Sequence, residues 1–387
     1  MQFETKAIRL QHERGHREHS VPLYLTSSFI FEDAEQARAL FADEVEGNIY
    51  SRFSNPNVNE FVTKMCALEG CEDGFGTATG MAAVFSSMMP FLKQGDHVLA
   101  SSALFASSTR IMNDYLPKWG ISVSYFDIQQ PETWEGMIQE NTKMIFAETP
   151  SNPGLVLIDL QFLCDLGKKH SILVNIDNCF ATPYLQTPFS FGADIVTHSA
   201  TKFIDGQGRV VGGIVLGNKE IIKEVRAFCR QTGPAMSPFN AWVLSKSLET
   251  LHVRMDRHCE NALKLAQWLE QHAEIAQVNY PFLPTHPQYA LAKKQMKLGG
   301  GVVTFEVKGG YERGKKFLNS LKMFSHSANL GDTRTIATHP ASTTHSKIAE
   351  TVREAAGIFG GTVRVSVGLE HIDDIFADIE QALQASK

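Results

Sequence analysis

The sequence predicts an α/β fold, a mostly parallel sheet wrapped by helices, followed by a smaller α+β C-terminal domain. Two observations carry this prediction. From about Tyr50 to Asp177, segments with apolar residues at helical spacing alternate with short apolar runs typical of buried strands. After a long helical segment from Ser237 to about Gln271, strand and helix signals continue in a less regular order.

The first 47 residues lack this alternation, so we expect an N-terminal arm over residues 1–47 with a helical patch at Asp33–Ala42. A larger, cofactor-binding domain is expected over residues 48–247. Its sequence predicts four helices, each followed by a strand: Gly80–Leu92 and His97–Ala100, Thr109–Lys118 and Ile121–Phe126, Thr133–Glu140 and Lys143–Glu148, Leu160–His170 and Ile172–Asp177. In such sheets ligands bind beyond the carboxyl ends of the strands.

The C-terminal domain is expected over residues 248–387. Apolar alternation predicts strands at Gly301–Val307 and Val363–Val367, and helical spacing predicts helices at Arg313–Leu321 and Asp373–Leu383.

Composition excludes several classes of protein. A net charge of −6 and a pI near 6.2 argue against a nucleic-acid binder. The longest apolar stretches fall short of the ~20 residues that span a bilayer, and Met1–Lys6 shows no signal peptide. We therefore expect a cytoplasmic protein. The 6 cysteines form no C-x-x-C pair and no metal-binding spacing is present, so we expect reduced thiols and no metal site.

The strongest chemical signal is Lys202, at the end of the run Ser199–Lys202, with Asp177 upstream. A buried lysine amine is less protonated, and it can condense with an aldehyde. An ionised Asp177 at the end of a buried strand is costly unless it meets a cation, such as a protonated pyridine ring. Ser199 and Thr201 offer hydroxyls to a phosphate. Together these residues predict a site for pyridoxal phosphate.

A glycine turn strengthens this prediction. Thr79, Gly80 and Met81 open a predicted helix, whose free amides can hold a phosphate. Alone the turn is a weak signal, because the spacing of its glycines misses the dinucleotide fingerprint by one residue. The α/β alternation and glycine-rich turns leave a nicotinamide-dependent oxidoreductase open as an alternative, although the missing fingerprint and the Asp177/Lys202 arrangement count against it. An inactive binding protein of the same fold is a further alternative.

These residues resemble the Cys/Met-metabolism (transsulfuration) family of pyridoxal-phosphate enzymes, which has the fold of aspartate aminotransferase, known as fold type I. The resemblance is strongest in three segments, Tyr50–Pro56, Asp177–Gln186 and His198–Lys202. Two further segments, Lys202–Arg209 and Thr232–Trp242, are similar to the O-succinylhomoserine sulfhydrylase branch.

The resemblance implies that Lys202 is catalytic and binds the cofactor, with Asp177 on the ring nitrogen. Phe105 stands where most of the family has a tyrosine stacked on the cofactor ring. Tyr50 and Arg52 match a pair that reaches the phosphate of the neighbouring subunit. We therefore expect a homo-oligomer, a tetramer built from dimers with shared active sites.

Other positions bear on substrate choice. In the family, the match of Arg364 grips the substrate α-carboxylate, the match of Asn152 contacts that carboxylate or the cofactor, and Asn329 lies in a substrate-binding motif. Ala328 stands where cystathionine-forming and cystathionine-cleaving members often carry glutamate. Ser107 stands where methionine γ-lyases carry cysteine.

The resemblance thus implies conversion of O-succinylhomoserine and sulfide to homocysteine and succinate. The expected partners are an amino-acid substrate and sulfide. A cystathionine γ-synthase, an O-acetylhomoserine sulfhydrylase and a methionine or cystathionine γ-lyase stay open as alternatives.

Overall fold

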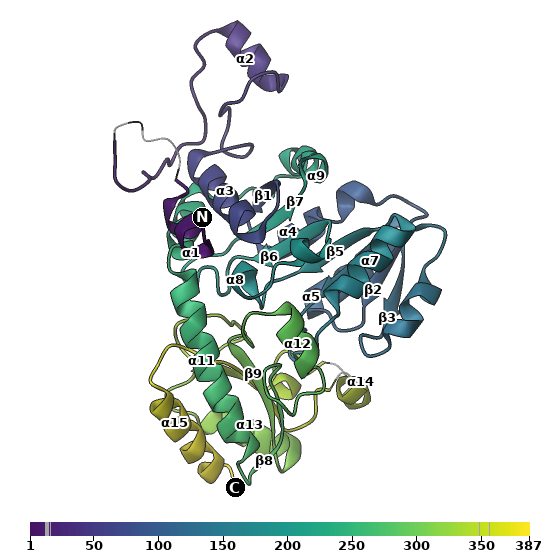
Figure 1. The fold of residues 1–387 in the computed structure, drawn as a ribbon, viewed down its shortest axis with the longest axis vertical. Helices are drawn as coiled ribbons and strands as arrows, with labels where there is room; N and C mark the ends of the chain where they lie inside the picture. The colour runs from purple at the N-terminus through teal and green to yellow at the C-terminus, as the bar shows by residue number, and fades with distance from the viewer. Residues whose placement is uncertain (12–14, 16, 348, 356) are drawn as a thin grey trace.

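The computed structural model describes residues 1–11, 15, 17–347, 349–355 and 357–387 and confirms the mostly parallel sheet (Figure 1). Seven strands form it in the order β1-β7-β6-β5-β4-β2-β3, and β7 alone runs antiparallel to its neighbours. The strands are β1 (Asp73–Thr77), β2 (His97–Ser101), β3 (Ser122–Phe126), β4 (Thr142–Glu148), β5 (Leu173–Asp177), β6 (Ile195–Ser199) and β7 (Gly213–Gly217).

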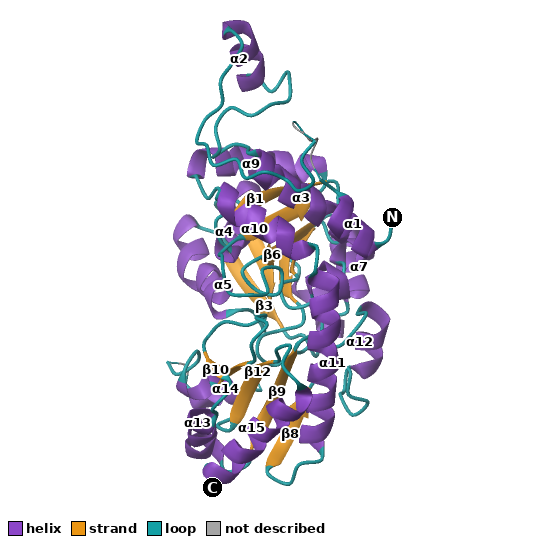
Figure 2. Ribbon diagram, turned by 90° about the vertical axis from the view of Figure 1, so that its left-hand side faces the viewer, coloured by secondary structure: helices purple, strands orange, loops and turns teal. Residues whose placement is uncertain are grey.

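Helices flank this sheet on both faces (Figures 1 and 2). In chain order they are α3 (Pro56–Glu69), α4 (Gly80–Ser86), α5 (Ala106–Arg110), α6 (Pro131–Trp134), α7 (Leu160–His170), α8 (Thr182–Leu185), α9 (Lys219–Thr232) and α10 (Pro238–Leu248). Shorter turns complete the set: 3-10 segments at Met89–Phe91, Leu116–Trp119, Glu135–Met137 and Pro188–Phe191, and a π-helical turn at Ile111–Tyr115.

The helix expected over Ser237–Gln271 is two helices, α10 and α11 (Leu251–Glu270). The carbonyl oxygen of Ser247 accepts hydrogen bonds from the Thr250 N–H at 3.2 Å and from the Arg254 guanidinium at 3.0 Å. These bonds close the last turn of α10, so the chain changes direction before α11 begins. The helices expected at Gly80–Leu92 and Thr109–Lys118 are likewise broken, each near an internal proline.

The C-terminal part contains a five-stranded sheet in the order β10-β11-β12-β9-β8. Its strands are β8 (Ile275–Asn279), β9 (Val302–Val307), β10 (Ser325–His326), β11 (Ile336–Thr338) and β12 (Thr362–Ser366). Its helices are α11, α12 (Tyr289–Gln295), α13 (Gly310–Ser320), α14 (Glu350–Ala355) and α15 (Ile372–Ala385), with a 3-10 turn at Pro340–Ser342. The expected boundary at residues 247 and 248 stays a prediction.

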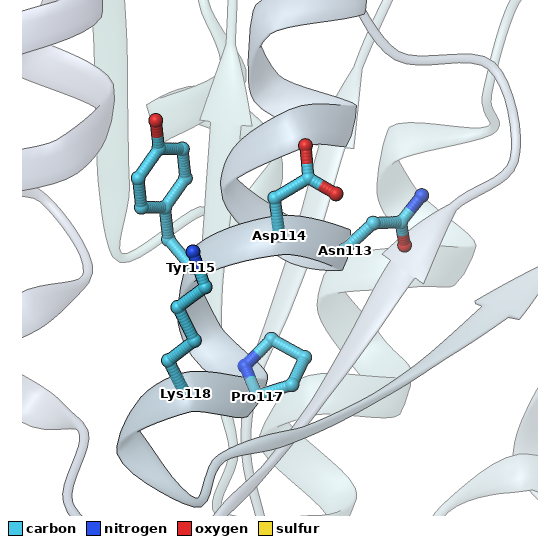
Figure 3. Close-up of a pocket in the computed structure, with 5 residues that line it drawn as sticks. All are labelled: Asn113, Asp114, Tyr115, Pro117 and Lys118. Atoms are coloured by element: carbon cyan, nitrogen blue, oxygen red, sulfur yellow. The ribbon is translucent and has the colours of Figure 1, made fainter.

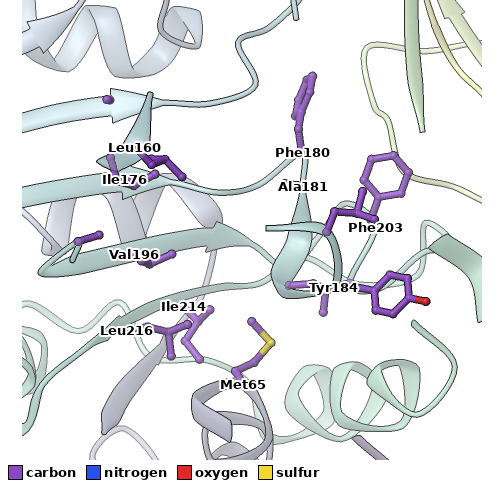
Figure 4. Packing of buried hydrophobic residues seen from close by; sticks show 14 of the residues in the cluster. Met65, Leu160, Ile176, Phe180, Ala181, Tyr184, Val196, Phe203, Ile214 and Leu216 are labelled. Atoms are coloured by element: carbon purple, nitrogen blue, oxygen red, sulfur yellow. The ribbon is translucent and has the colours of Figure 1, made fainter. Parts of the chain in front are cut away.

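Each sheet has its own apolar packing. Figure 4 shows side chains from the large sheet and its helices in one cluster, including Met65, Leu160, Ile176, Val196 and Leu216. A second cluster lies between the small sheet and helices α11, α13 and α15. Central parallel strands buried on both faces are held rigidly, so the residues at their carboxyl ends have fixed positions.

The N-terminal segment contains α1 (Phe3–Arg9) and α2 (Ala34–Phe41). Asp33 caps α2 by accepting a hydrogen bond from the Gln36 N–H, as expected for the helical patch in the arm. The segment with α2 projects from the body of the molecule (Figures 1 and 2), and Ile30 on it is fully exposed. In the described part of the chain, no helix has the length and apolar character needed to cross a membrane.

The close approach of β7 to the start of α4 is testable. A Cβ atom on Gly213 would lie 2.2 Å from the Thr79 carbonyl oxygen, so Gly213→Ala must displace backbone. We expect it to destabilise the fold by about 1–3 kcal/mol, read as a lower Tm. Gly136→Ala is the control, because a Cβ there meets nothing within 4 Å. An unchanged Tm for Gly213→Ala would contradict this packing.

Candidate active site

Lys202 follows β6 and turns toward the C-terminal part of the chain. Its Nζ donates a hydrogen bond to Asn329 Oδ1 at 2.6 Å. Burial lowers the pKa of the Lys202 amine; the nearby Cys179 thiol raises it and the Arg364 guanidinium lowers it further. A larger fraction of the amine is therefore neutral, which is the form that attacks a carbonyl or accepts a proton.

Arg364 lies on β12 and is 4% exposed. Its guanidinium donates to Asn152 Oδ1 at 3.0 Å and to the backbone carbonyls of Asn329 at 3.0 Å and Ala328 at 3.4 Å. Its Nε is buried without a partner, and burial lowers the pKa of Arg364 to about 10. Within the described residues it forms no ion pair. A buried cation held by neutral groups is a site for an anion such as a carboxylate.

Asp177 ends β5, beside β6 in the sheet. Its Oδ1 accepts a hydrogen bond from the Cys179 N–H at 3.1 Å. Burial raises the pKa of Asp177 to about 6, although the charge of His198 and the Cys179 N–H oppose this rise. The carboxylate therefore lacks a strong cationic partner, and a protonated ring nitrogen would stabilise it.

The residues predicted to hold the phosphate, at the start of α4 and at Ser199, lie next to one another. A Cβ on Gly80 would lie 2.5 Å from the Cβ of Ser199 and 2.7 Å from its Oγ, so the start of α4 rests against Ser199. Thr79 is the N-cap of α4, and its hydroxyl accepts from the Ala82 N–H at 2.9 Å. Met81 follows in the same turn.

Thr201 has a backbone partner across the turn after β6. Its hydroxyl accepts from the Gly212 N–H at 3.1 Å and lies 3.3 Å from the Gly212 carbonyl oxygen. The structure thus places Thr201 beside β7 with its hydroxyl already bonded, whereas the hydroxyl of Ser199 lies next to Gly80.

Phe105 precedes α5 and its side chain is 41% exposed, free to contact a ring. Its N–H donates to Glu148 Oε2 at 2.7 Å. Glu148 was not among the predicted site residues, although it ends β4 as Asp177 ends β5, and the two residues are paired in the sheet. That position at a strand end is the signal that could have identified it.

Tyr50 and Arg52 are not brought to the other predicted residues. The Arg52 guanidinium lies 5.6 Å from the centroid of the Tyr50 ring and donates to the Arg230 carbonyl. No hydrogen bond or ion pair among the described residues joins this pair to Lys202 or Asp177. The contact of Tyr50 and Arg52 with the cofactor phosphate of a neighbouring subunit stays a prediction.

An open surface pocket lies elsewhere (Figure 3). It is lined by Asn113, Asp114, Tyr115, Pro117 and Lys118. None of these residues is among those predicted to bind cofactor or substrate.

The residues present fit pyridoxal phosphate. Asp177 is a half-buried carboxylate whose pKa is raised by desolvation, Lys202 is an amine whose pKa is lowered, and Gly80 against Ser199 leaves no room for a side chain at the phosphate seat. Lys202, Asp177 and the start of α4 would hold the aldehyde, ring nitrogen and phosphate respectively.

Comparisons with known proteins agree with pyridoxal phosphate as the cofactor. The family model for "Cys/Met metabolism PLP-dependent enzyme" matches residues 4–384. The chain is 45% identical over 384 residues to an O-succinylhomoserine sulfhydrylase of Pseudomonas aeruginosa, covering 99% of this chain and 95% of the relative. It is 43% identical to an L-methionine gamma-lyase of Porphyromonas gingivalis, covering 95% and 92% respectively.

A solved structure is similar as well. A Campylobacter jejuni protein assigned as an O-acetylhomoserine (thiol)-lyase superposes with a TM-score of 0.95 at 34% identity, covering 99% of this chain and 100% of that one. It carries a pyridoxyl-lysine monophosphate residue.

Asp177→Asn tests the role of the Asp177 charge. The folded pKa of Asp177 of about 6 lies above its ordinary value of 3.8, so the apoprotein loses stability as pH rises from about 4 to about 6. The neutral variant avoids this loss. Apo Asp177→Asn should therefore have a higher Tm than apo wild type at pH 8, and the difference should shrink toward pH 4.

The same variant should lose at least about 10²–10⁴-fold in turnover, because general acid–base contributions alone are of that size and loss of the electron sink should cost at least as much. Near-normal turnover, or a lower apo Tm at pH 8, would contradict the role assigned to Asp177.

Proposed function

Because the chain belongs to the Cys/Met metabolism family of PLP-dependent enzymes, we propose that it carries out γ-replacement on O-succinylhomoserine, with sulfide giving homocysteine and succinate. The proposal is supported by the 45% identity to an O-succinylhomoserine sulfhydrylase over almost the whole chain. The resemblance of Lys202–Arg209 and Thr232–Trp242 to that branch supports the same choice.

One observation carries the choice of sulfide. The loop of residues 327–329 contacts both Lys202 and Arg364, through Asn329 Oδ1 and through the carbonyls of Ala328 and Asn329. Ala328 is exposed at this position and presents a methyl group. A second amino acid such as cysteine carries an ammonium that needs an acceptor on entry. Sulfide needs no such acceptor.

The residues of this chain have separable tasks in the proposed reaction. When bound, pyridoxal phosphate supplies an electron sink for charge that develops at the substrate Cα. The guanidinium of Arg364 binds the α-carboxylate, and Asn152 fixes its orientation. Lys202 Nζ, with its lowered pKa, accepts the proton from Cα. A β proton and the succinate group then leave, sulfide adds at the γ carbon, and protons return to Cβ and Cα to give homocysteine.

A second candidate is methionine γ-lyase activity, favoured by the 43% identity to the Porphyromonas gingivalis enzyme. In that reaction no nucleophile adds at the γ carbon after methanethiol leaves; protons return to the carbon chain, and water releases it as 2-oxobutanoate and ammonia. Ser107 counts against this candidate, because it stands on α5, two residues after Phe105, where the lyases carry a cysteine.

We further propose a homotetramer of dimers with shared sites. Tyr50 is 41% exposed, and the contacts of Arg52 within the chain are to Tyr50, Phe53 and Arg230 rather than to the phosphate seat. A Tyr/Arg pair of this kind can contact the cofactor phosphate of a second subunit, because a guanidinium matches the geometry of phosphate oxygens.

The choice of nucleophile is tested by kcat/KM with O-succinylhomoserine and either sulfide or cysteine. Burial of an unpaired charged group costs about 1–3 kcal/mol or more. The kcat/KM with sulfide should therefore exceed the kcat/KM with cysteine by roughly tenfold or more. Ala328→Glu should narrow that ratio, whereas Ala328→Gln, of equal size without the charge, should not. If cysteine equals sulfide in the wild type, the enzyme is a cystathionine synthase. Methionine cleavage should be slight.

Shared sites predict complementation. Arg52→Ala and Lys202→Ala proteins, each nearly inactive, should regain activity when unfolded together and reassembled, because mixed dimers contain one site with both residues intact. Mixing two Lys202→Ala preparations is the control. Absence of recovery in a sample shown to contain mixed dimers would place Arg52 in the site of its own chain.

A further inference from the structure

Glu148 is a buried acid to which the proposed reaction assigns no task. It ends β4, is 4% exposed, and is paired in the parallel ladder with Asp177, which ends β5. Two acids thus lie side by side at the edge of the sheet where the cofactor residues gather. Within the described residues, neither forms an ion pair with lysine or arginine.

The contacts of Glu148 reach two loops. Its Oε2 accepts a hydrogen bond from the Phe105 N–H at 2.7 Å, at the start of α5. The backbone amide of Asn152, in the loop after β4, also faces its carboxyl group and lowers the pKa of that group. Asn152 in turn accepts from Arg364 at 3.0 Å. One carboxyl group therefore connects the Phe105 segment, the Asn152 segment and the strand end next to Asp177.

Glu148 is buried and Asp177 is half-buried, and two adjacent carboxyl groups in such surroundings do not both ionise readily, because desolvation and mutual repulsion penalise the second charge. The groups that face Glu148 are Asp177 from β5, the Cys179 thiol after β5, and the amides of Phe105 and Asn152. None is a cation. Burial, followed by the charge of Asp177, raises the pKa of Glu148 well above its usual range, against the smaller effect of the two amides.

We propose that Glu148 is a positioning residue that acts as a neutral carboxyl group. It holds the Phe105 and Asn152 segments in place and leaves Asp177 as the single negative charge beside the ring nitrogen. Phe105 is thereby held for contact with the ring, and Asn152 for its bond to Arg364. This role does not depend on which acyl ester or sulfur nucleophile the enzyme uses.

Infrared difference spectra test the protonation state without substrate. At pH 8, the wild-type apoprotein minus Glu148→Gln should show a protonated-carboxyl C=O band. The matched control is Glu140→Gln, an exposed glutamate just before β4, whose difference spectrum should show only carboxylate bands. A carboxylate band for Glu148 would overturn the proposal.

Kinetics test the positioning role. Glu148→Leu keeps the bulk of the side chain but removes both acceptors, and a displacement of catalytic groups of about 1 Å can cost about 100-fold. We expect kcat/KM to fall by about that factor, with a raised KM for the amino acid through the Asn152–Arg364 contact. Glu148→Gln, which keeps an acceptor oxygen without charge, should restore most of the loss.

These outcomes do not depend on the natural substrate, because the assay uses any amino-acid substrate that the wild type turns over. If folded, cofactor-loaded Glu148→Gln is as impaired as Glu148→Leu, the neutral role is wrong. Full activity in Glu148→Leu would show that Glu148 positions neither segment.

Discussion

The register between β4 and β5 is the constraint on which the site depends. It pairs Glu148 with Asp177 at the carboxyl edge of the sheet, and the pairing of β5 with β6 brings the turn that carries Lys202 to the same edge. These strands are buried on both faces, so a change of register would break the core. The free energy gained by burying the apolar core therefore offsets the repulsion and desolvation of the ionisable groups that lie together at this edge.

The C-terminal part completes this edge. Gly331 has φ +76°, and a Cβ on it would lie 2.4 Å from the backbone nitrogen of Phe203, so the loop after Asn329 packs directly on the chain beyond Lys202. From the other side, Arg254 on α11 donates to the carbonyls of Phe203 and Ile204. Lys202 is thus fixed by backbone contacts on both sides. Only the Nζ end of the Lys202 side chain is free to exchange its hydrogen-bond partner.

The features that could be predicted from the sequence are those that a local residue pattern determines. The mostly parallel sheet, the strand ends at Glu148 and Asp177, and the start of α4 at Gly80 follow from periodicity and turn residues. Sequence reasoning did not identify β1 or β7, whose glycine-rich sequences lack an alternating pattern, or the break before α11, which depends on Arg254 from the next helix. The contacts of Asn329 and Arg364 with Lys202 and Asn152 are long-range, so their roles came from family resemblance. The role proposed for Tyr50 and Arg52 involves a second subunit, so the structure of one chain does not test it.

Lys202 is the residue that we expect to carry the cofactor at this edge. The most direct measurement is borohydride reduction of the yellow, pyridoxal-phosphate-loaded protein, followed by peptide mapping by mass spectrometry. The account predicts a pyridoxyl group on the peptide that contains Lys202, and none in Lys202→Ala treated in the same way. A stoichiometric label on any other lysine would contradict it.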